Sequence, residues 1–269
     1  MTALLGMMLA GTLMISGSGA AWVSLAPGLE LGRFDPWLVA AADDGALTVL
    51  RVDPELWQIR VMTAAEEDLE TRGLDLPRWC RQTGAVAVIN AGMYQEDGTT
   101  HVGFCQTRGV VRSAGVNDYL SALLCDPRHE GVPPFALADL DEADLDSLRA
   151  DYGTVVQNLR LIKRPSENRW SRTGERWLEA ALAEDAQGRA LLIHCAVPLS
   201  MHDFNEVLLA LPLDVVAAQH LEGNHPAGLW VRLPAGDGGD DTRVVPVARG
   251  GTVPNVLAVL PRQAESGVE

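Results

Sequence analysis

The chain has 269 residues, of which 47% are hydrophobic, and this is enough to form one large core or two small ones. Its formal net charge is -15 at pH 7, because 36 acidic residues outnumber 21 basic residues. This balance excludes the broad basic surface that nucleic-acid binding requires, so no nucleic-acid partner is expected.

The N-terminal segment has the pattern of an export signal. Residues 2–15 are almost wholly apolar, and small residues follow at positions 16–21. The apolar run is shorter than the roughly 20 residues that span a membrane. Small residues after such a run are typical of a cleaved signal peptide. We therefore expect residues 1–20 to be a signal peptide, or alternatively a membrane anchor, and residues 21–269 to form a single domain that is exported to the periplasm or the extracellular space. No stable membrane span is expected after signal cleavage.

The four cysteines are Cys80, Cys105, Cys125 and Cys195. Their wide spacing, without a Cys-x-x-Cys motif, argues against a zinc site. In an oxidising compartment four cysteines allow three complete pairings. Cys105 and Cys125 are the first expected pair, because they lie on segments predicted to be neighbouring strands. Four buried thiols that pack as small hydrophobic side chains are an equally good interpretation.

The first half of the chain predicts strands, a short helix and a buried strand, in that order. Residues 47–50 and 57–62 indicate two half-buried antiparallel strands. Asp75 is a predicted helix N-cap, and the helix is expected to end before Gly84. The five apolar residues before Asn90 then predict a strand that is covered on both faces. Asn90 therefore stands at the carboxyl end of a strand, where such folds tend to place their chemistry.

The second half of the chain is also rich in strands. An acidic run that begins at Asp139 predicts a short helix, and Ser200 is the predicted cap of a helix that ends near Leu211. Strands are expected at 101–105, 110–112, 119–125, 155–162, 177–182, 190–195, 215–221, 229–233, 244–247 and 256–260, with the 229–233 strand pairing back on 215–221. Many strands and few helices predict an α+β fold of mixed, largely antiparallel sheets with a few packed helices.

Several motifs occur in a recognisable order: Asn-Ala-Gly-Met-Tyr at 90–94, a strand that begins at Gln157, an Asp-x-x-Gly turn at 185–188, and Leu-Glu-Gly-Asn at 221–224. Together they resemble the phosphodiester glycosidase family over most of the mature chain. This resemblance implies a phosphodiester-glycosidase-like fold and an exported hydrolase that cleaves a sugar phosphodiester or a related envelope glycan at the anomeric carbon. It also implies a carbohydrate or sugar-phosphate partner, and no cofactor is expected.

Sugar release of this kind needs a carboxylic acid that assists departure of the leaving group, and a second group that activates water or stabilises an oxocarbenium ion. The catalytic candidates are Glu222, Asn90, Glu96 and Glu179, with Glu222 as the first choice. Glu222 stands where the family typically has Asp, and Glu179 stands where the family has Arg.

The substrate-binding candidates come from the same motifs and from one basic loop. Tyr94 and Gln157 belong to the resembling segments, and Asn224 offers an amide to sugar hydroxyls. Arg169 and Arg172 lie in a basic loop that is a candidate site for binding an anion, although a solvated loop is the simpler interpretation. Asn90 and Asn224 also have a simpler interpretation as residues that accommodate turn geometry.

Two alternatives remain open at the level of sequence. A carboxylate at Glu179 in place of a guanidinium would repel a phosphate, so the chain is alternatively a catalytically inactive or repurposed member that binds a glycan or an envelope partner. His220, Glu222 and His225, with His101, form the second alternative, a metal site. Their spacing matches no established metal motif, so no metal is expected.

Overall fold

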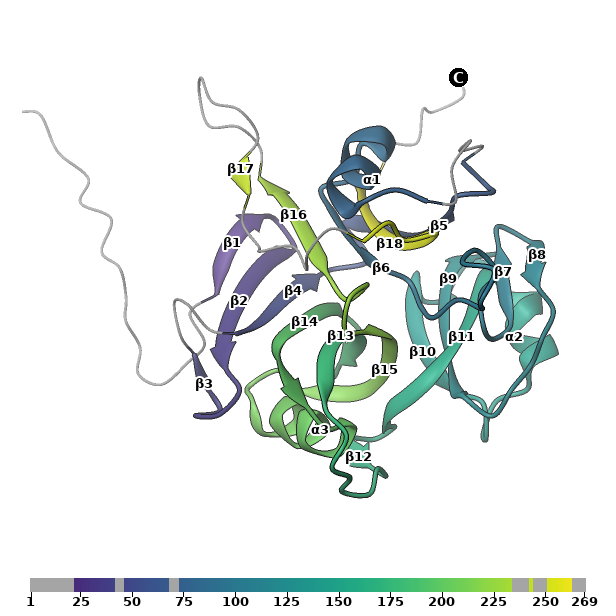
Figure 1. Ribbon diagram of the computed structural model, residues 1–269. Coiled ribbons are helices and arrows are strands. Elements are labelled where there is room, and N and C mark those ends of the chain that lie inside the picture. The colour runs from purple at the N-terminus through teal and green to yellow at the C-terminus, as the bar shows by residue number, and fades with distance from the viewer. Residues whose placement is uncertain (1–21, 42–45, 68–72, 234–241, 244–250, 263–269) are drawn as a thin grey trace, which may run out of the picture.

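A computed structural model describes residues 22–41, 46–67, 73–233, 242–243 and 251–262 (Figure 1). Strands account for 50% of the chain, and three helices occur in the described residues. Every strand pair there is antiparallel, which agrees with the expected largely antiparallel α+β fold. The predicted signal segment and the predicted strand at 244–247 lie outside the described residues.

The larger of two sheets is long and curved. Along its main path the strands are β1 (Val23–Ala26), β2 (Leu29–Asp35), β4 (Leu47–Val52), β14 (Ala190–Leu199), β13 (Trp177–Asp185), β15 (Val215–Gly223), β11 (Tyr152–Lys163), β7 (Cys105–Thr107) and β8 (Val110–Ser113). Four further strands pair beside this path: β3 (Ala40–Ala41), β9 (Leu120–Pro127), β10 (Phe135–Asp139) and β12 (Glu167–Asn168).

The smaller sheet is built from strands that are far apart in the sequence. Their order is β17 (Thr242–Arg243), β16 (Leu229–Leu233), β6 (Ala87–Asn90), β18 (Asn255–Pro261) and β5 (Trp57–Thr63). The predicted strand at 229–233 is therefore present, but the prediction of its partner is wrong. β16 pairs with β6 and not with β15, because the turn after Glu222 carries the chain from one sheet to the other.

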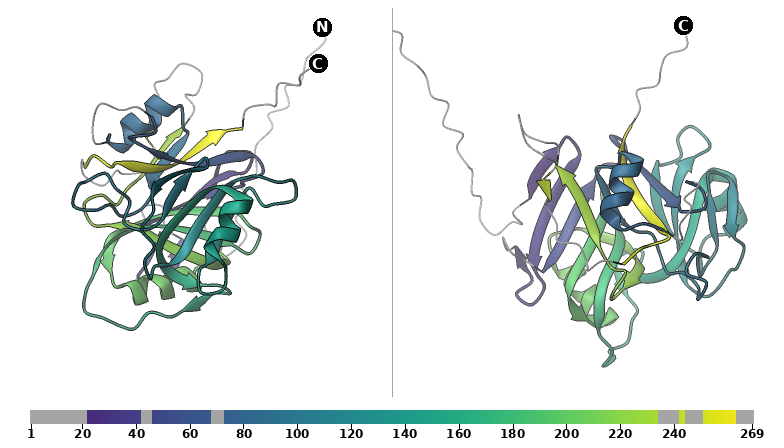
Figure 2. Two further views of the ribbon diagram at one scale, coloured as in Figure 1. Left: turned by 90° about the vertical axis from the view of Figure 1, so that its right-hand side faces the viewer. Right: turned by 45° about the horizontal axis from the view of Figure 1, so that its top comes forward.

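The two sheets and the helices form layers (Figures 1 and 2). The largest hydrophobic cluster lies between the sheets and takes residues from both. Helix α3 (Met201–Ala210) covers the other face of the large sheet, and α1 (Leu76–Thr83) covers the other face of the small sheet. Helix α2 (Leu145–Asp151) packs beside β9 and β11. No helix in the described residues is long and apolar enough to cross a membrane.

Strand β6 contains an unbroken apolar run because both of its faces are buried. Ala87 and Ile89 face the cluster between the sheets, whereas Val88 faces the cluster under α1. Both faces of the strand are therefore buried, as the sequence predicted. The helix caps are confirmed as well: Asp75 accepts a hydrogen bond from Arg78 N, and Ser200 accepts one from Asp203 N.

Two local predictions differ from the structure. The acidic run at 139 does not open a helix: Asp139 ends strand β10, and α2 begins at Leu145 behind an Asp144 cap. Apolar alternation at 135–139 was the overlooked signal. The strand predicted at 101–105 also begins later than expected, since β7 begins at Cys105 rather than at His101.

The predicted Cys105–Cys125 disulfide is wrong. β11 lies between β7 and β9, so the two cysteines are two strands apart. Two inter-strand spacings amount to about 10 Å, beyond the roughly 7 Å that a disulfide can join. All four cysteines are buried thiols, as in the alternative interpretation, and burial raises the pKa of Cys105 to about 12.

Candidate functional site

The two motif loops meet where the two sheets meet. Asn90 ends β6 of the small sheet, and Glu222 lies near the end of β15 of the large sheet. The backbone N–H of Gly228 donates to Asn90 Oδ1 over 3.2 Å, and Asn158 Nδ2 donates to Ala91 O over 3.1 Å. These hydrogen bonds join the Asn90 loop to the turn after Glu222 and to β11.

The glycine of the Asn-Ala-Gly motif is required by the packing of this loop. Gly92 has a φ of 147°, which side chains rarely adopt. A Cβ atom there would lie 2.4 Å from Asn158 Oδ1 and 2.6 Å from His101 Cε1. Gly92 therefore lets the loop approach two buried polar side chains directly.

Glu179 and His220 form a buried pair on adjacent strands. Glu179 lies on β13 and is fully buried, and His220 lies on β15 with 4% of its surface exposed. Glu179 Oε2 is 2.7 Å from His220 Nδ1. A carboxylate accepts a hydrogen bond from Nδ1–H and so fixes the tautomer in which Nε2 can accept a proton. This pair therefore has the chemistry of an oriented base.

Glu222 follows His220 by two positions on β15, and both members of the pair influence its pKa. It is opposite Ala180, which packs between the sheets, whereas His220 is opposite Ala181, which packs under α3. Burial raises the pKa of Glu222, and the charge of Glu179 acts in the same direction. The Gly223 N–H, which donates to Glu222 Oε1 over 3.1 Å, and His220 oppose this effect. A carboxyl with a raised pKa retains its proton more readily, which suits a general acid.

Tyr94 belongs to the same site. Burial raises the pKa of its hydroxyl, and so does the negative charge of Glu222. Tyr94 is bridged to His101 through the backbone, so the loop that begins at Asn90 folds back on itself. The Asn90 loop and the Glu222 turn are therefore neighbours in the structure.

Several buried polar atoms around this site have no hydrogen-bond partner within the protein. They are Asn90 Nδ2, His101 Nδ1, Trp177 Nε1 and Glu179 Oε1. Trp177 is close to the Glu222 turn, because a Cβ atom on Gly223 would lie 3.5 Å from Trp177 Cδ1 and 3.6 Å from His220 Cε1. Buried polar groups are normally paired, so these four atoms are candidates for hydrogen bonds to a polar ligand.

Gln157 positions loops instead of facing the site with a free amide. Gln157 Oε1 accepts from the backbone N–H groups of Phe104 and Asn117, and Nε2 donates to Asn117 O. The backbone carbonyl of Gln157 also lies 2.7 Å from His101 Nε2. Three of the four hydrogen bonds that an amide can form are thus committed.

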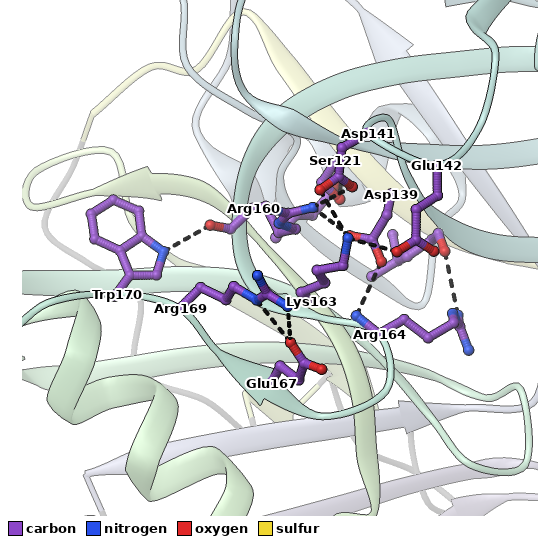
Figure 3. A network of polar contacts seen from close by, with 12 residues as sticks. Ser121, Asp139, Asp141, Glu142, Arg160, Lys163, Arg164, Glu167, Arg169 and Trp170 are labelled. Atoms are coloured by element: carbon purple, nitrogen blue, oxygen red, sulfur yellow. Dashed lines mark hydrogen bonds and ion pairs between the residues drawn. The ribbon is translucent and has the colours of Figure 1, made fainter.

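The other candidates lie at the surface. Glu96 is exposed in the loop after Tyr94, and Asn224 is exposed with a φ of 54° in the turn after Glu222. Arg169 is exposed and pairs with Glu167 (Figure 3). Arg172 is exposed as well, and its charge adds to the Ser200 hydrogen bond in lowering the pKa of Asp203 at the start of α3.

The alternative metal site finds no matching geometry. His220 Nδ1 is held by Glu179, and His225 is exposed beyond the turn. Within the described ranges no group of three or more His, Cys, Asp or Glu side chains is arranged to hold a metal ion.

Comparison with known proteins adds the family. The model of the phosphodiester glycosidase family matches residues 83–260, about two thirds of the chain. The chain belongs to the phosphodiester glycosidase family. The match includes Asn90, Glu179, His220 and Glu222, so the whole candidate site lies inside the family region. No curated protein sequence matches the chain significantly.

Solved structures share the fold of this phosphodiester glycosidase family member. The catalytic domain of zebrafish N-acetylglucosamine-1-phosphodiester alpha-N-acetylglucosaminidase, auto-inhibited by its pro-peptide, is 14% identical with a TM-score of 0.60, and the match covers 91% of this chain and 87% of that chain. A hypothetical protein from Synechocystis is 13% identical with a TM-score of 0.56, and the match covers 90% of this chain. The chain spans 61% of the length of that protein.

Sequence reasoning did not assign His220, Asn158 or His101 to a glycosidase site. From the sequence His220 is a candidate only as a metal ligand, because its partner Glu179 is 41 residues away. The pairing depends on the register of β13 and β15, which contains two irregularities. The one available signal was a histidine two positions before Glu222 on the same strand.

Proposed function

We propose that this protein is an exported glycosidase-type hydrolase that cleaves a sugar phosphodiester or a related envelope glycan at the anomeric carbon. The observation that carries this proposal is the Gly228–Asn90 hydrogen bond, which joins the Asn90 loop to the turn after Glu222, a carboxyl group with a raised pKa. Family membership supports the same class of reaction. Export rests on the apolar segment at 2–15 and the small residues after it.

In the proposed reaction Glu222 acts as the general acid. Its carboxyl group donates a proton to the oxygen that links the anomeric carbon to the leaving group, and the C–O bond breaks. Water forms the new bond to the anomeric carbon and gives its proton to His220 Nε2. The products are the free sugar and the protonated leaving group, and proton exchange with solvent restores both side chains.

Glu179 has a positioning role in this scheme. It is fully buried, so it acts through His220 rather than on the substrate. It holds His220 Nδ1 and stabilises the positive charge that the imidazole gains when Nε2 takes a proton. Asn90 Nδ2 and the Tyr94 hydroxyl are the proposed contacts to sugar hydroxyls, since Asn90 Nδ2 has no partner within the protein.

The test is turnover of an aryl phosphodiester of N-acetylglucosamine and of an aryl N-acetylglucosaminide by the purified mature chain. Glu222→Gln keeps the shape of the side chain and removes its proton, so we expect kcat to fall by about 10²-fold or more. Glu96→Gln is the matched control, because Glu96 is exposed in the loop after Tyr94, and its kcat should change by less than about twofold.

Each result has a defined meaning. Equal turnover by Glu222→Gln and the parent chain would contradict the role of Glu222. Sugar binding without turnover of either substrate would favour the alternative, a family member that binds a glycan without cleaving it.

A further inference from the structure

The hairpin of β2 and β3 ends in an exposed apolar loop, and Figure 1 shows β3 at the margin of the molecule. Asp35 is opposite Ala40 in the register, and the loop between them contains Trp37, Leu38 and Val39, which we call the hairpin tip. The exposed fractions of these three residues are 61%, 76% and 36%. Such loops are normally built from polar residues, glycine and proline. Elsewhere in the described residues, exposed large hydrophobic side chains occur singly or as one pair, so the hairpin tip is the longest exposed apolar run there.

The backbone of the hairpin tip is held by neighbouring residues. Asp35 Oδ1 accepts hydrogen bonds from Trp37 N over 2.8 Å and from Leu38 N over 3.1 Å. Phe34 and Pro36, on either side of Asp35, are buried. Moving an unpaired N–H group into an apolar medium is costly, but the N–H groups of the two most exposed residues are already paired. Trp37 and Leu38 can therefore leave water without an unsatisfied N–H group.

The hairpin tip lies close to the point where the N-terminal segment joins the fold. Trp22 is the first described residue, and its ring packs against that of Phe34 with 5.7 Å between the centroids. β1 runs antiparallel to β2 and Val23 is opposite Leu31, so β1 begins at the end of β2 that carries the hairpin tip. Only residues 16–21 separate Trp22 from the apolar run at 2–15. A signal peptide and a membrane anchor, the two interpretations of that run, both place it at a bilayer. The hairpin tip is therefore beside the junction with a segment that is directed to a membrane.

The side chains of the hairpin tip suit a bilayer better than a protein surface. A stable protein interface buries about 800 Å² on each partner, which is far more than three side chains at the end of a hairpin offer. Tryptophan prefers the membrane interface, where its apolar ring meets acyl chains and its N–H stays near polar headgroups. Leu38 adds aliphatic surface that gains free energy on leaving water. An indole beside an aliphatic side chain is the chemistry of a shallow lipid contact.

The charge of the chain indicates which lipid the hairpin tip would meet. The net charge is -15, Asp43 and Asp44 follow β3, and no Lys or Arg occurs between Arg33 and Arg51. Anionic headgroups attract clusters of Lys and Arg, and they repel an acidic protein. The contact is therefore apolar, and a zwitterionic lipid such as phosphatidylcholine is the expected surface.

We propose that the hairpin tip inserts into the interface of a lipid bilayer and holds the mature protein on a membrane surface without spanning it. Trp37 and Leu38 enter the lipid, and the buried Phe34 ties them to the hydrophobic cluster under α3. The inference is independent of the proposed hydrolysis, because none of the candidate catalytic residues lies on β2 or β3. An exported chain with this contact remains at the membrane surface after its signal peptide is cleaved.

The test is sedimentation of the mature chain, residues 21–269, with sucrose-loaded phosphatidylcholine vesicles. This chain contains every described residue and lacks the apolar run at 2–15, which would bind lipid by itself. Leu38→Ser removes an aliphatic side chain from the hairpin tip, and we expect it to lower the partition coefficient about tenfold. Leu56→Ser is the matched control, because Leu56 is 51% exposed but lies beside Gly28, at the opposite end of β2. Its partition coefficient should stay within about twofold of the parent value.

Quenching of tryptophan fluorescence locates the contact. Vesicles of brominated phosphatidylcholine should quench part of the fluorescence of the mature chain. Trp37→Phe should still sediment with these vesicles but lose most of the quenching, because the tryptophan that enters the lipid is gone.

The inference is overturned if the mature chain does not sediment with phosphatidylcholine, if Leu38→Ser and Leu56→Ser bind equally, or if Trp37→Phe is quenched as strongly as the parent chain. Tighter binding to anionic phosphatidylglycerol that salt abolishes would also overturn it, by indicating a charged contact. So would a mature chain that is dimeric without lipid and becomes monomeric in Leu38→Ser, because the hairpin tip would then bind a second copy. None of these measurements depends on turnover, so failure of the proposed hydrolase leaves them unchanged.

Discussion

At the scale of single residues, the role proposed for Glu179 depends on its hydrogen-bond partner, His220. The family resemblance implies an arginine at this position, and a carboxylate there would repel a phosphate. In the fold that carboxylate is fully buried and bonded to His220. A buried carboxylate beside an imidazole converts the pair into an oriented base, so the charge reversal is consistent with chemistry that does not require a grip on phosphate.

Glu222 gives a prediction for stability as a function of pH. Its pKa in the folded chain is raised above 4.5, so the folded chain binds this proton more strongly than the unfolded chain does. The resulting stabilisation is fully present below pH 4.5 and is lost as the pH rises through the folded pKa. Glu222→Gln carries no charge at any pH. It should therefore raise the free energy of unfolding, relative to the parent chain, more at pH 8 than at pH 4. Urea unfolding of both chains at both pH values measures this difference, and an equal effect at the two pH values would contradict it.

Gly92 gives a prediction about packing. A Cβ atom there meets Asn158 Oδ1 and His101 Cε1, so Gly92→Ala should lower the free energy of unfolding by about 2–4 kcal/mol. Gly98→Ala is the matched control, because Gly98 also has a positive φ, of 71°, but a Cβ atom added there would have no neighbouring atom within 4 Å. That variant should lose about 1 kcal/mol, the cost of the backbone conformation alone. Equal losses in urea unfolding would show that the packing around Gly92 is not tight.

At the scale of elements, the sequence was most informative where one local rule decides. The caps Asp75 and Ser200 and the apolar run of β6 were each predicted from a few neighbouring residues. The pairing partner of a strand, by contrast, is not decided by neighbouring residues in the sequence. Nothing near Leu229 indicates that β16 leaves β15 and pairs with β6, because that choice depends on burial between two sheets.

Strand β18 gives the prediction at this scale. It lies between β5 and β6, and Val256, Leu257, Ala258 and Val259 are fully buried. Removing residues 251–269 should therefore abolish the cooperative unfolding transition, because two strands would lose their shared neighbour and two hydrophobic clusters would be opened. Removing only 263–269 should leave the melting temperature within about 2 °C. Circular dichroism during heating measures both, and a cooperative transition in the shorter chain would contradict the central role of β18.

At the scale of the whole molecule, the candidate site lies at the junction of the two sheets. Asn90 ends a strand of the small sheet and Tyr94 lies in the loop after it, while Glu179, His220 and Glu222 lie on strands of the large sheet. The sequence predicted Asn90 and Glu222 as catalytic candidates, since the motif order resembled a known family. It did not predict the Glu179–His220 pair, because that pair depends on the register of β13 and β15.

The burial of the four cysteine thiols affects how the protein responds to a reducing agent. Cys80, Cys105, Cys125 and Cys195 are all enclosed by the core, and burial raises the pKa of Cys195 to about 11. Almost none of that thiol is present as the nucleophilic anion near neutral pH. Because none of the four forms a disulfide, we expect residues 21–269 to unfold at the same urea concentration with and without dithiothreitol.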